Sequence, residues 1–137
     1  MTTQYWLVKS EPETYAFAHL MRDGRTAWTG VRNFAARLHL KAMRSGDGVL
    51  FYESGARKAV VGTAEVSRAA FPDDTADEPG WVAVELKAGA ALPSPVTLAH
   101  IKAEPALAKM TLLRISRLSV QPVARGEFER IVKLGGG

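Results

Sequence analysis

The sequence predicts an α+β fold in which short helices flank a small, curved, mostly antiparallel β-sheet or partial barrel. The 137 residues are 47% hydrophobic, which matches one domain with a single substantial core. Strand-like runs recur at irregular spacing between short helical patterns, whereas a doubly wound parallel sheet needs regular alternation. We assign residues 1–134 to one domain and expect the glycine tail at 135–137 to fray.

Apolar runs alternate with turn signals in the first part of the chain. Residues 5–8 are aromatic and β-branched and end before Pro12, which predicts a strand and a turn. Residues 15–21 have the pattern of a short helix, and residues 25–29 read as extended. The next helical pattern ends near residues 45–46; its apolar face comprises Val31, Phe34, Ala35, Leu38 and Ala42, and its basic face comprises Asn33, Arg37, Lys41 and Arg44.

Strand patterns dominate the middle of the chain, and helical patterns return toward its end. An acidic, proline-containing stretch between the last two central strands predicts a surface loop. In order, we expect strands at 49–52, 60–66 and 81–86, a short helix at 97–103, a last strand at 112–118, and a final helical turn or two at 126–132.

Composition excludes several classes of chemistry. The chain has no cysteine, which rules out disulfides, thiol catalysis and cysteine-ligated metals. Its three histidines are far apart without a metal-site spacing, so we expect no metal and no cofactor. No uncharged apolar stretch reaches the roughly 18 residues that span a bilayer, and residues 1–4 do not resemble an export signal. We therefore expect a cytoplasmic protein with no membrane partner.

The charge of the chain is basic and unevenly placed. The net charge is +4, yet four of the 14 acidic residues fall between positions 73 and 78, a stretch without basic residues. The remaining surface is accordingly more basic than the total indicates, which favours a polyanion such as nucleic acid. A moderately basic pI is also common in proteins of other function, so composition leaves both readings open.

The most informative polar residues stand where predicted elements meet. Lys9, Ser10 and Glu11 follow the first strand, where polar groups can face a ligand, although Ser10 and Glu13 also have the spacing of a helix capping box. Trp28 precedes Arg32 and Asn33 at the start of the basic helix. A tryptophan can stack on a base there while arginine binds phosphate, or it can be a core residue beside a solvated helix.

Two further candidates are weaker, and no catalytic motif is present. Tyr52 and Ser54 end a buried strand, and Arg117 interrupts an apolar run, but a core tyrosine and an edge arginine explain both. The sequence contains no nucleophile elbow, phosphate-binding loop or dinucleotide fingerprint. Lys9 and Glu11 are the only candidate acid–base pair.

Several of these motifs together resemble the EVE domain family. The carriers are Tyr-Trp-Leu-Val-Lys-Ser-Glu-Pro at 5–12, Trp-Thr-Gly-Val-Arg-Asn at 28–33 and Arg-Leu-Ser-Val-Gln-Pro-Val at 117–123, and the resemblance runs over nearly the whole chain. It implies a PUA-like fold, a small curved barrel with flanking helices that is related to YTH and ASCH domains. It also implies a pocket for a modified nucleobase, such as methylated or hydroxymethylated cytosine, in DNA or RNA.

The resemblance also implies a set of site residues. Carried over by motif, the nucleobase pocket comprises Lys9, Ser10, Glu11, Trp28, Arg32, Asn33, Tyr52, Ser54 and Arg117. We expect the basic helix to hold the nucleic-acid backbone through Arg37, Lys41 and Arg44. Because Trp28 would supply the stacking surface, we expect Trp28→Ala to abolish preference for a modified base while leaving the fold intact.

The chain departs from the family pattern at three positions. Leu38 stands where an asparagine is usual, and Glu53 stands where a histidine is usual, which would place a phosphate-repelling carboxylate near the pocket. Ala16 replaces a serine that would start a helix, and a missing cap of this kind costs about 1 kcal/mol.

Together these observations favour a non-catalytic, monomeric module that accommodates a modified nucleobase of a nucleic acid. One alternative is an ASCH-like amidohydrolase that acts on a modified nucleoside through Lys9 and Glu11. A second alternative is a partner-binding domain whose pocket is vestigial.

Overall fold

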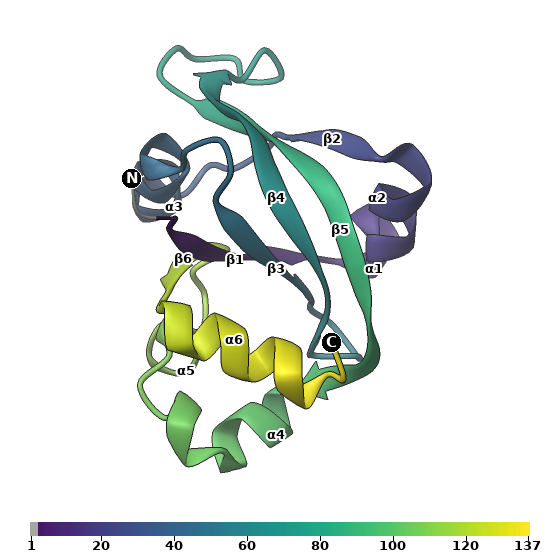
Figure 1. Ribbon diagram of the computed structural model, residues 1–137. Coiled ribbons are helices and arrows are strands. Elements are labelled where there is room, and N and C mark those ends of the chain that lie inside the picture. The colour runs from purple at the N-terminus through teal and green to yellow at the C-terminus, as the bar shows by residue number, and fades with distance from the viewer. Residues whose placement is uncertain (1–2) are drawn as a thin grey trace.

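Six strands form one mixed, curved sheet in the order β2-β5-β4-β3-β1-β6 (Figure 1). The computed structural model describes residues 3–137, so residues 1–2 of the predicted domain lie outside the described residues. The β1–β3 pairing is parallel and the other pairings are antiparallel. The strands are β1 (Tyr5–Ser10), β2 (Arg25–Trp28), β3 (Gly48–Glu53), β4 (Ala59–Pro72), β5 (Val82–Thr97) and β6 (Val120–Val123). This arrangement confirms the predicted α+β class, although β2 and β6 are the edges of a sheet that stays open.

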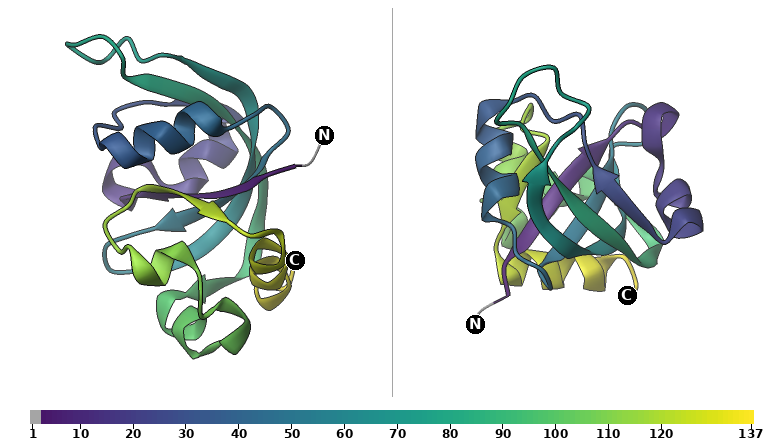
Figure 2. Two further views of the ribbon diagram at one scale, coloured as in Figure 1. Left: turned by 90° about the vertical axis from the view of Figure 1, so that its left-hand side faces the viewer. Right: turned by 90° about the horizontal axis from the view of Figure 1, so that it is seen from above.

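Short helices cover both faces of the sheet. On the first face lie α1 (Pro12–Tyr15), α2 (Phe17–Asp23) and α3 (Phe34–Ala42). On the second face lie α4 (Leu98–Ala103), the short 3-10 helix η1 (Pro105–Leu107), α5 (Thr111–Arg114) and α6 (Arg125–Leu134). In Figure 2, α3 lies at one side of the first face and the α1–α2 pair lies at the other side, and the β4–β5 loop projects on the α3 side.

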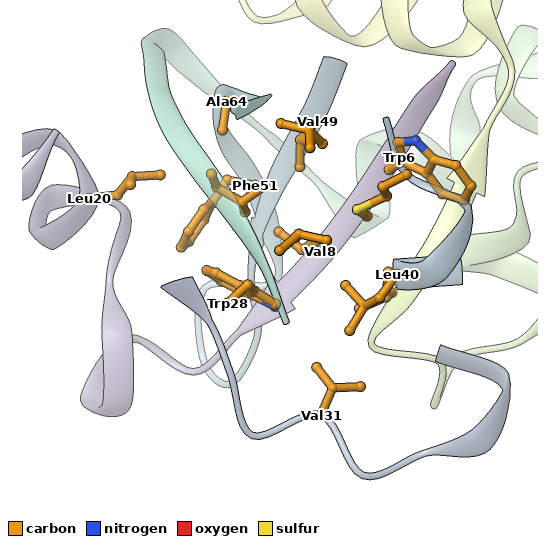
Figure 3. Close-up of a cluster of buried hydrophobic side chains, with 14 of the residues drawn as sticks. Trp6, Val8, Leu20, Trp28, Val31, Leu40, Val49, Phe51 and Ala64 are labelled. Carbon is orange, nitrogen blue, oxygen red and sulfur yellow. The ribbon is translucent and has the colours of Figure 1, made fainter. Parts of the chain in front are cut away.

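Alternation along the central strands builds two hydrophobic cores. Val8 on β1 and Phe51 on β3 face the first core, whereas their neighbours Leu7 and Leu50 face the second. The first core packs against α2 and α3 and contains both Trp6 and Trp28 (Figure 3). The second core is closed by residues of α4, η1 and α6, including Ile101, Leu107 and Ile131.

A glycine lets α2 approach the sheet closely. Gly62 lies on β4 directly beneath Phe17, and a Cβ atom at position 62 would stand 2.3 Å from the Phe17 Cζ atom. No side chain fits at that distance, so glycine is required for Phe17 to pack edge-on against Phe51. The β3–β4 and β4–β5 registers shift on either side of this position.

The predicted last strand at 112–118 is wrong. Thr111–Arg114 is the helix α5, and the strand β6 begins at Val120. A short apolar run fits a strand and a buried helix turn equally well, and here the helix lets Leu112 pack into the second core. The strand β6 contains Pro122 and pairs with β1 alone, and an edge strand tolerates a proline.

Several predicted boundaries move. The first helical pattern is two helices joined at Ala16, and the basic helix begins at Phe34, not Val31, and ends at Ala42. Strands β4 and β5 have 14 and 16 residues, longer than predicted, because their register shifts let them bend and continue beyond the core.

The predicted apolar face of the basic helix is solvent-facing. Phe34 is 67% exposed and Leu38 is 65% exposed, while Ala36 and Leu40 face the first core. Two apolar stripes at helical spacing run along α3, and the sequence pattern does not distinguish which one packs. The stripe that packs against the sheet is formed by Ala36 and Leu40, and Val31 and Met43 extend it at its two ends.

Hydrogen bonds connect the glycine tail to α6 and to β5. Gly136 has a φ of 81°, and its N–H donates to the Lys133 carbonyl. The Gly137 N–H donates to the Val132 carbonyl. These two bonds form a Schellman motif that terminates α6. The Gly135 carbonyl also accepts from the Ser94 N–H at 3.0 Å, which attaches the tail to β5.

No helix within residues 3–137 is long and apolar enough to cross a membrane. The longest helix of this range, α6, has ten residues. Across the same residues, no group of three or more histidine, aspartate or glutamate side chains is arranged to hold a metal ion.

Candidate nucleic-acid interface

A cleft of about 700 Å³ opens beside the first core, where β1 and β2 end. One wall is the end of β1 with α1, and the other wall is β2 with the segment that leads into α3. Its volume lies within the range of small-molecule sites. The lining residues are Lys9, Ser10, Glu11, Thr14, Tyr15, Thr26, Ala27, Trp28, Thr29, Gly30, Val31, Arg32, Asn33 and Ser119.

The predicted residues Lys9, Ser10, Glu11, Trp28, Arg32 and Asn33 therefore share one cleft. Tyr52, Ser54 and Arg117 are placed elsewhere: Tyr52 is buried in the second core, and Arg117 is exposed between α5 and β6. Ser54 donates from its N–H to the Ser10 carbonyl at 2.9 Å, so it supports the end of β1 from behind.

Sequence reasoning missed the lining residues between and beside the motifs. Tyr15 and Thr14 belong to a helix that follows the first motif, and Thr26 and Thr29 flank Trp28. A signal was available for Thr26, which stands two residues before Trp28, since alternate residues of a strand share a face. Ser119 lies within the motif at 117–123, and it borders the cleft because its carbonyl accepts from the Lys9 N–H.

Ser10 is oriented by the chain that follows it. Its Oγ donates to the Tyr15 carbonyl at 2.6 Å, so the capping-box alternative for Ser10 and Glu13 is wrong. A hydroxyl has one proton and two lone pairs, and the proton is already used. Ser10 can therefore accept a hydrogen bond from a group in the cleft.

Lys9 and Glu11 are not brought together as an acid–base pair. The Lys9 ammonium donates to the Ser116 carbonyl and lies 5.8 Å from the centre of the Tyr52 ring. Burial lowers the pKa of Lys9, and burial raises the pKa of the Tyr52 hydroxyl beside it. Glu11 is exposed, and no contact between the two side chains is present in the described part of the chain.

Trp28 lines the cleft and belongs to the core at the same time. It is 9% exposed and meets Tyr15 and Phe51 edge-to-face, at ring-centre distances of 6.3 Å and 5.5 Å (Figure 3). The core alternative for Trp28 is confirmed, and base stacking stays a prediction. The expectation that Trp28→Ala leaves the fold intact is not compatible with this packing, because truncating a buried aromatic opens a cavity.

The acidic loop between β4 and β5 fixes the second wall of the cleft. The Asp73 carboxylate, whose side chain is fully buried, accepts from the Gly30 N–H at 2.9 Å and from Arg32 Nη1 at 3.0 Å. Burial raises the pKa of this carboxyl, but hydrogen bonds from Thr75 and Gly30 outweigh burial and hold the pKa well below its usual range. Gly30 has a φ of 80°, a conformation that glycine adopts without strain.

Asn33 joins the cleft to α3. Its Oδ1 accepts from the Ala36 N–H at 2.9 Å and caps the helix. The cap fixes the orientation of the amide, so the group that Asn33 has left for a ligand is the Nδ2 donor.

The basic residues of α3 have different surroundings. Arg37 donates to the Gly80 carbonyl at 3.2 Å, and its guanidinium lies 4.7 Å from the centre of the Trp81 ring. Lys41 and Arg44 are exposed, and the Arg44 N–H donates to Asp47 at the start of the β3 turn. Of the three residues predicted to contact phosphates, Arg37 is thus held in place by its neighbours, and Lys41 and Arg44 lie at the surface.

Glu53 does not present a carboxylate to the cleft. It is 7% exposed, its Oε2 accepts from the Phe17 N–H at 2.9 Å, and its Oε1 lies 3.4 Å from Arg57 Nε. A carboxylate at a helix N-terminus satisfies an unpaired amide and is favoured by the helix dipole. Glu53 thereby supplies α2 with the cap that Ala16 lacks, and His19 Nδ1 accepts from the Ala16 N–H at 2.9 Å.

The fold and the motif-lined cleft are those of a PUA-like module, and the sequence model of the EVE domain matches residues 4–134. The chain belongs to the EVE domain family, as predicted. Thymocyte nuclear protein 1 of mouse (Mus musculus) is 30% identical over an alignment of 166 residues, which covers 96% of this chain and 74% of the relative.

Solved structures agree with this assignment. A protein of Rhodopseudomonas palustris is 48% identical and superposes with a TM-score of 0.92, covering 98% of this chain and 94% of the other. Human THYN1, solved in complex with DNA that contains 5-methylcytosine, is 27% identical with a TM-score of 0.91, covering 98% of this chain and 99% of the other. An ASCH protein of Zymomonas mobilis, at 14% identity and a TM-score of 0.60, shows a likeness of fold alone.

Proposed function

We propose that this protein is a non-catalytic module that binds nucleic acid and accommodates a modified nucleobase, with methylated cytosine as the first candidate, in the cleft between β1 and β2. The observation that carries the proposal is the cleft itself: ten of its fourteen lining residues come from the motifs that mark the family. The human THYN1 complex with 5-methylcytosine-containing DNA supports the ligand class.

The cleft offers the groups that a single base needs. A base must leave its stack to enter, which costs a few kcal/mol in a duplex and less in a single strand. Trp28 and Tyr15 provide aromatic surface, Val31 and Ala27 provide apolar surface, and Asn33 provides a donor. A methyl group buried against such apolar surface contributes about 0.8 kcal/mol, which corresponds to about a fourfold preference over the unmodified base.

The basic side of α3 provides the attraction for the backbone. Arg37 and Lys41 stand on the helix that begins at the mouth of the cleft, and Arg44 follows the end of that helix. Their contacts with phosphates would not depend on sequence. Base preference and backbone attraction therefore come from separate groups and respond to separate substitutions.

Fluorescence anisotropy with single-stranded and duplex oligonucleotides, of DNA and RNA, tests the proposal. Matched probes carry cytosine, 5-methylcytosine or 5-hydroxymethylcytosine at one position. We expect tighter binding of one modified probe and a stronger preference in single strands than in duplexes. Equal affinity for all probes would show that the protein binds nucleic acid only through its basic surface, without recognising the modified base. Absence of binding would contradict the proposal.

Two substitutions at position 33 separate the ligand contact from the helix cap. Serine caps a helix as well as asparagine does but has no amide, whereas alanine lacks both. Asn33→Ser should keep the stability of the wild type and weaken binding of the preferred probe by about tenfold, the equivalent of one lost hydrogen bond. Asn33→Ala should lose stability as well as affinity. An Asn33→Ser variant with unchanged affinity would show that Asn33 does not contact the ligand.

A further inference from the structure

The side of α3 that faces solvent carries two large apolar side chains where a surface helix normally carries polar ones. Phe34 and Leu38 are one helical turn apart and are 67% and 65% exposed. Phe34 directly follows Asn33, which lines the cleft, so this apolar surface begins where the cleft ends. Contiguous exposed apolar surface next to a binding cleft is typical of an interaction site.

The Phe34 ring packs against two other flat groups, the Arg37 guanidinium and the Trp81 ring. The Arg37 guanidinium lies 4.8 Å from the centre of the Phe34 ring and 4.7 Å from the centre of the Trp81 ring. The two rings are 5.3 Å apart and tilted by 33°. Arg32 lies 5.7 Å from the Trp81 ring on the way to the cleft. We call Phe34, Leu38 and Trp81, with the Arg37 guanidinium that contacts both rings, the aromatic platform.

The chemistry of the platform selects the class of partner. A flat aromatic surface braced by guanidinium groups suits a nucleobase, since bases stack on aromatic rings and on arginine planes, and the nearby positive charge attracts their phosphates. Arg37 and Lys41 lie beside the platform on α3, whereas Arg32, which contacts the Trp81 ring, is paired with the Asp73 carboxylate. An apolar protein surface would gain nothing from these charges and would have to desolvate them.

We propose that the aromatic platform stacks the nucleotide next to the base in the cleft. This inference rests on the proposed function, because the neighbour is brought to the platform only when the cleft holds a base of the same strand. The continuity of Asn33 and Phe34 in the chain sets the two sites side by side. The platform thereby adds affinity through any neighbouring base and favours a strand whose neighbour is unpaired.

Abasic probes test the stacking contact directly. Single-stranded oligonucleotides carry 5-methylcytosine with an intact neighbour on both sides, or with an abasic site on one side or on the other. We expect the wild type to bind one of the two abasic probes about tenfold more weakly than the intact probe. In Phe34→Ala this difference should disappear, while the affinity for that abasic probe stays as in the wild type.

Met21→Ala is the matched control, since Met21 is a 45% exposed apolar residue on α2 outside the platform, and it should retain the tenfold difference. Equal wild-type affinity for intact and abasic probes, or a difference that survives in Phe34→Ala, would overturn the stacking proposal while leaving the cleft as the binding site. Failure of every probe to bind would instead reject the proposed function. Self-association of the wild type that Phe34→Ala abolishes would assign the platform to a second copy of the chain and overturn the proposal.

Discussion

The two faces of the sheet are stabilised by different kinds of interaction. On the second face, α4, η1, α5 and α6 close over a continuous apolar core, and its buried polar residues, Thr111 and Gln121, are uncharged. On the first face, α1, α2 and α3 leave room for the cleft, and this side holds the buried carboxylates Asp47, Glu53 and Asp73.

Each buried carboxylate of the first face accepts hydrogen bonds from backbone amides. Asp47 accepts from the Trp6 indole at 2.9 Å and from the Arg44 N–H at 2.9 Å, which ties the end of α3 to β1. Glu53 caps α2, and Asp73 holds the wall at Gly30. The comparison shows that a face which must stay open is fixed by directional bonds to backbone amides, whereas a closed face is fixed by burial of apolar area.

The largest effect is expected where the cleft and the first core share a residue. Trp28→Ala should lower the free energy of unfolding by about 3–5 kcal/mol, as much as Ile131→Ala in the closed core, for which we expect about 2–5 kcal/mol. Urea denaturation followed by circular dichroism measures both. A loss below 1 kcal/mol for Trp28→Ala would show that this tryptophan serves the ligand alone. Trp28→Phe preserves most of the packing and is the variant to use in binding experiments.

The substitution Asp73→Asn weakens the hydrogen bonds that hold the second wall of the cleft in place. The amide keeps one acceptor oxygen, so it can accept from Gly30 and Arg32 or from Thr75 but not from both sets, and the variant should lose about 1.5–3 kcal/mol of stability at pH 7. The exposed neighbour Asp74 provides the control, because Asp74→Asn should change stability by less than about 0.5 kcal/mol.

The pH dependence of the Asp73 contribution has a defined sign. The pKa of this carboxyl is lower in the folded protein than in the unfolded chain, so folding favours its charged form. The stabilisation is complete above the unfolded pKa of about 4 and is lost as the pH falls through the folded pKa. The difference in stability between wild type and Asp73→Asn should therefore be constant near neutrality and shrink in acid; a difference independent of pH down to pH 2 would contradict it.

Glu53 and Ala16 should behave as a coupled pair. Glu53→Ala leaves the N-terminus of α2 without its carboxylate and should cost about 1–2 kcal/mol. Adding Ala16→Ser to that variant supplies a local cap and should recover part of the loss, while Ala16→Ser alone should gain less because the amides are already served. Additive effects in this double-mutant cycle would separate the two positions.

The smallest effect is expected at the surface of the basic helix. Lys41→Ala should leave stability within about 0.5 kcal/mol of the wild type and weaken binding of all single-stranded probes alike. If Lys41 contacts one phosphate, the slope of log affinity against log salt should become shallower by about 0.7. Lys102→Ala, an exposed lysine on the closed face, should leave that slope unchanged.

The sequence predicted the class of fold and the motif residues of the cleft for physical reasons. Strands such as 5–8 and 49–52 are apolar on both sides because both faces of the sheet are covered, and such runs are easily recognised. The motifs at 5–12 and 28–33 are contiguous in the chain, so most of their polar residues reach the cleft together.

What the sequence did not reveal depends on contacts between distant segments. The acidic loop reads as solvated, yet Asp73 is buried because Gly30 and Arg32, more than 40 residues earlier, supply its partners. Tyr52 follows Phe51 on a strand covered on both faces, and the pattern does not indicate which face borders the cleft. The exposed stripe of α3 was predicted to be buried, since a stripe made for a ligand has the same period as one made for a core.

The pairing of β1 with β6 also governs the order in which the molecule can be assembled. Most of the cleft is encoded in the first 33 residues, but β1 is bordered on one side by β3 and on the other by β6, which comes from the far end of the chain. During synthesis the early segments must wait for the last strand before the sheet and the cleft wall at Ser119 are complete. Non-local pairing of this kind slows folding, so the binding site and the whole domain should mature in one late step after synthesis.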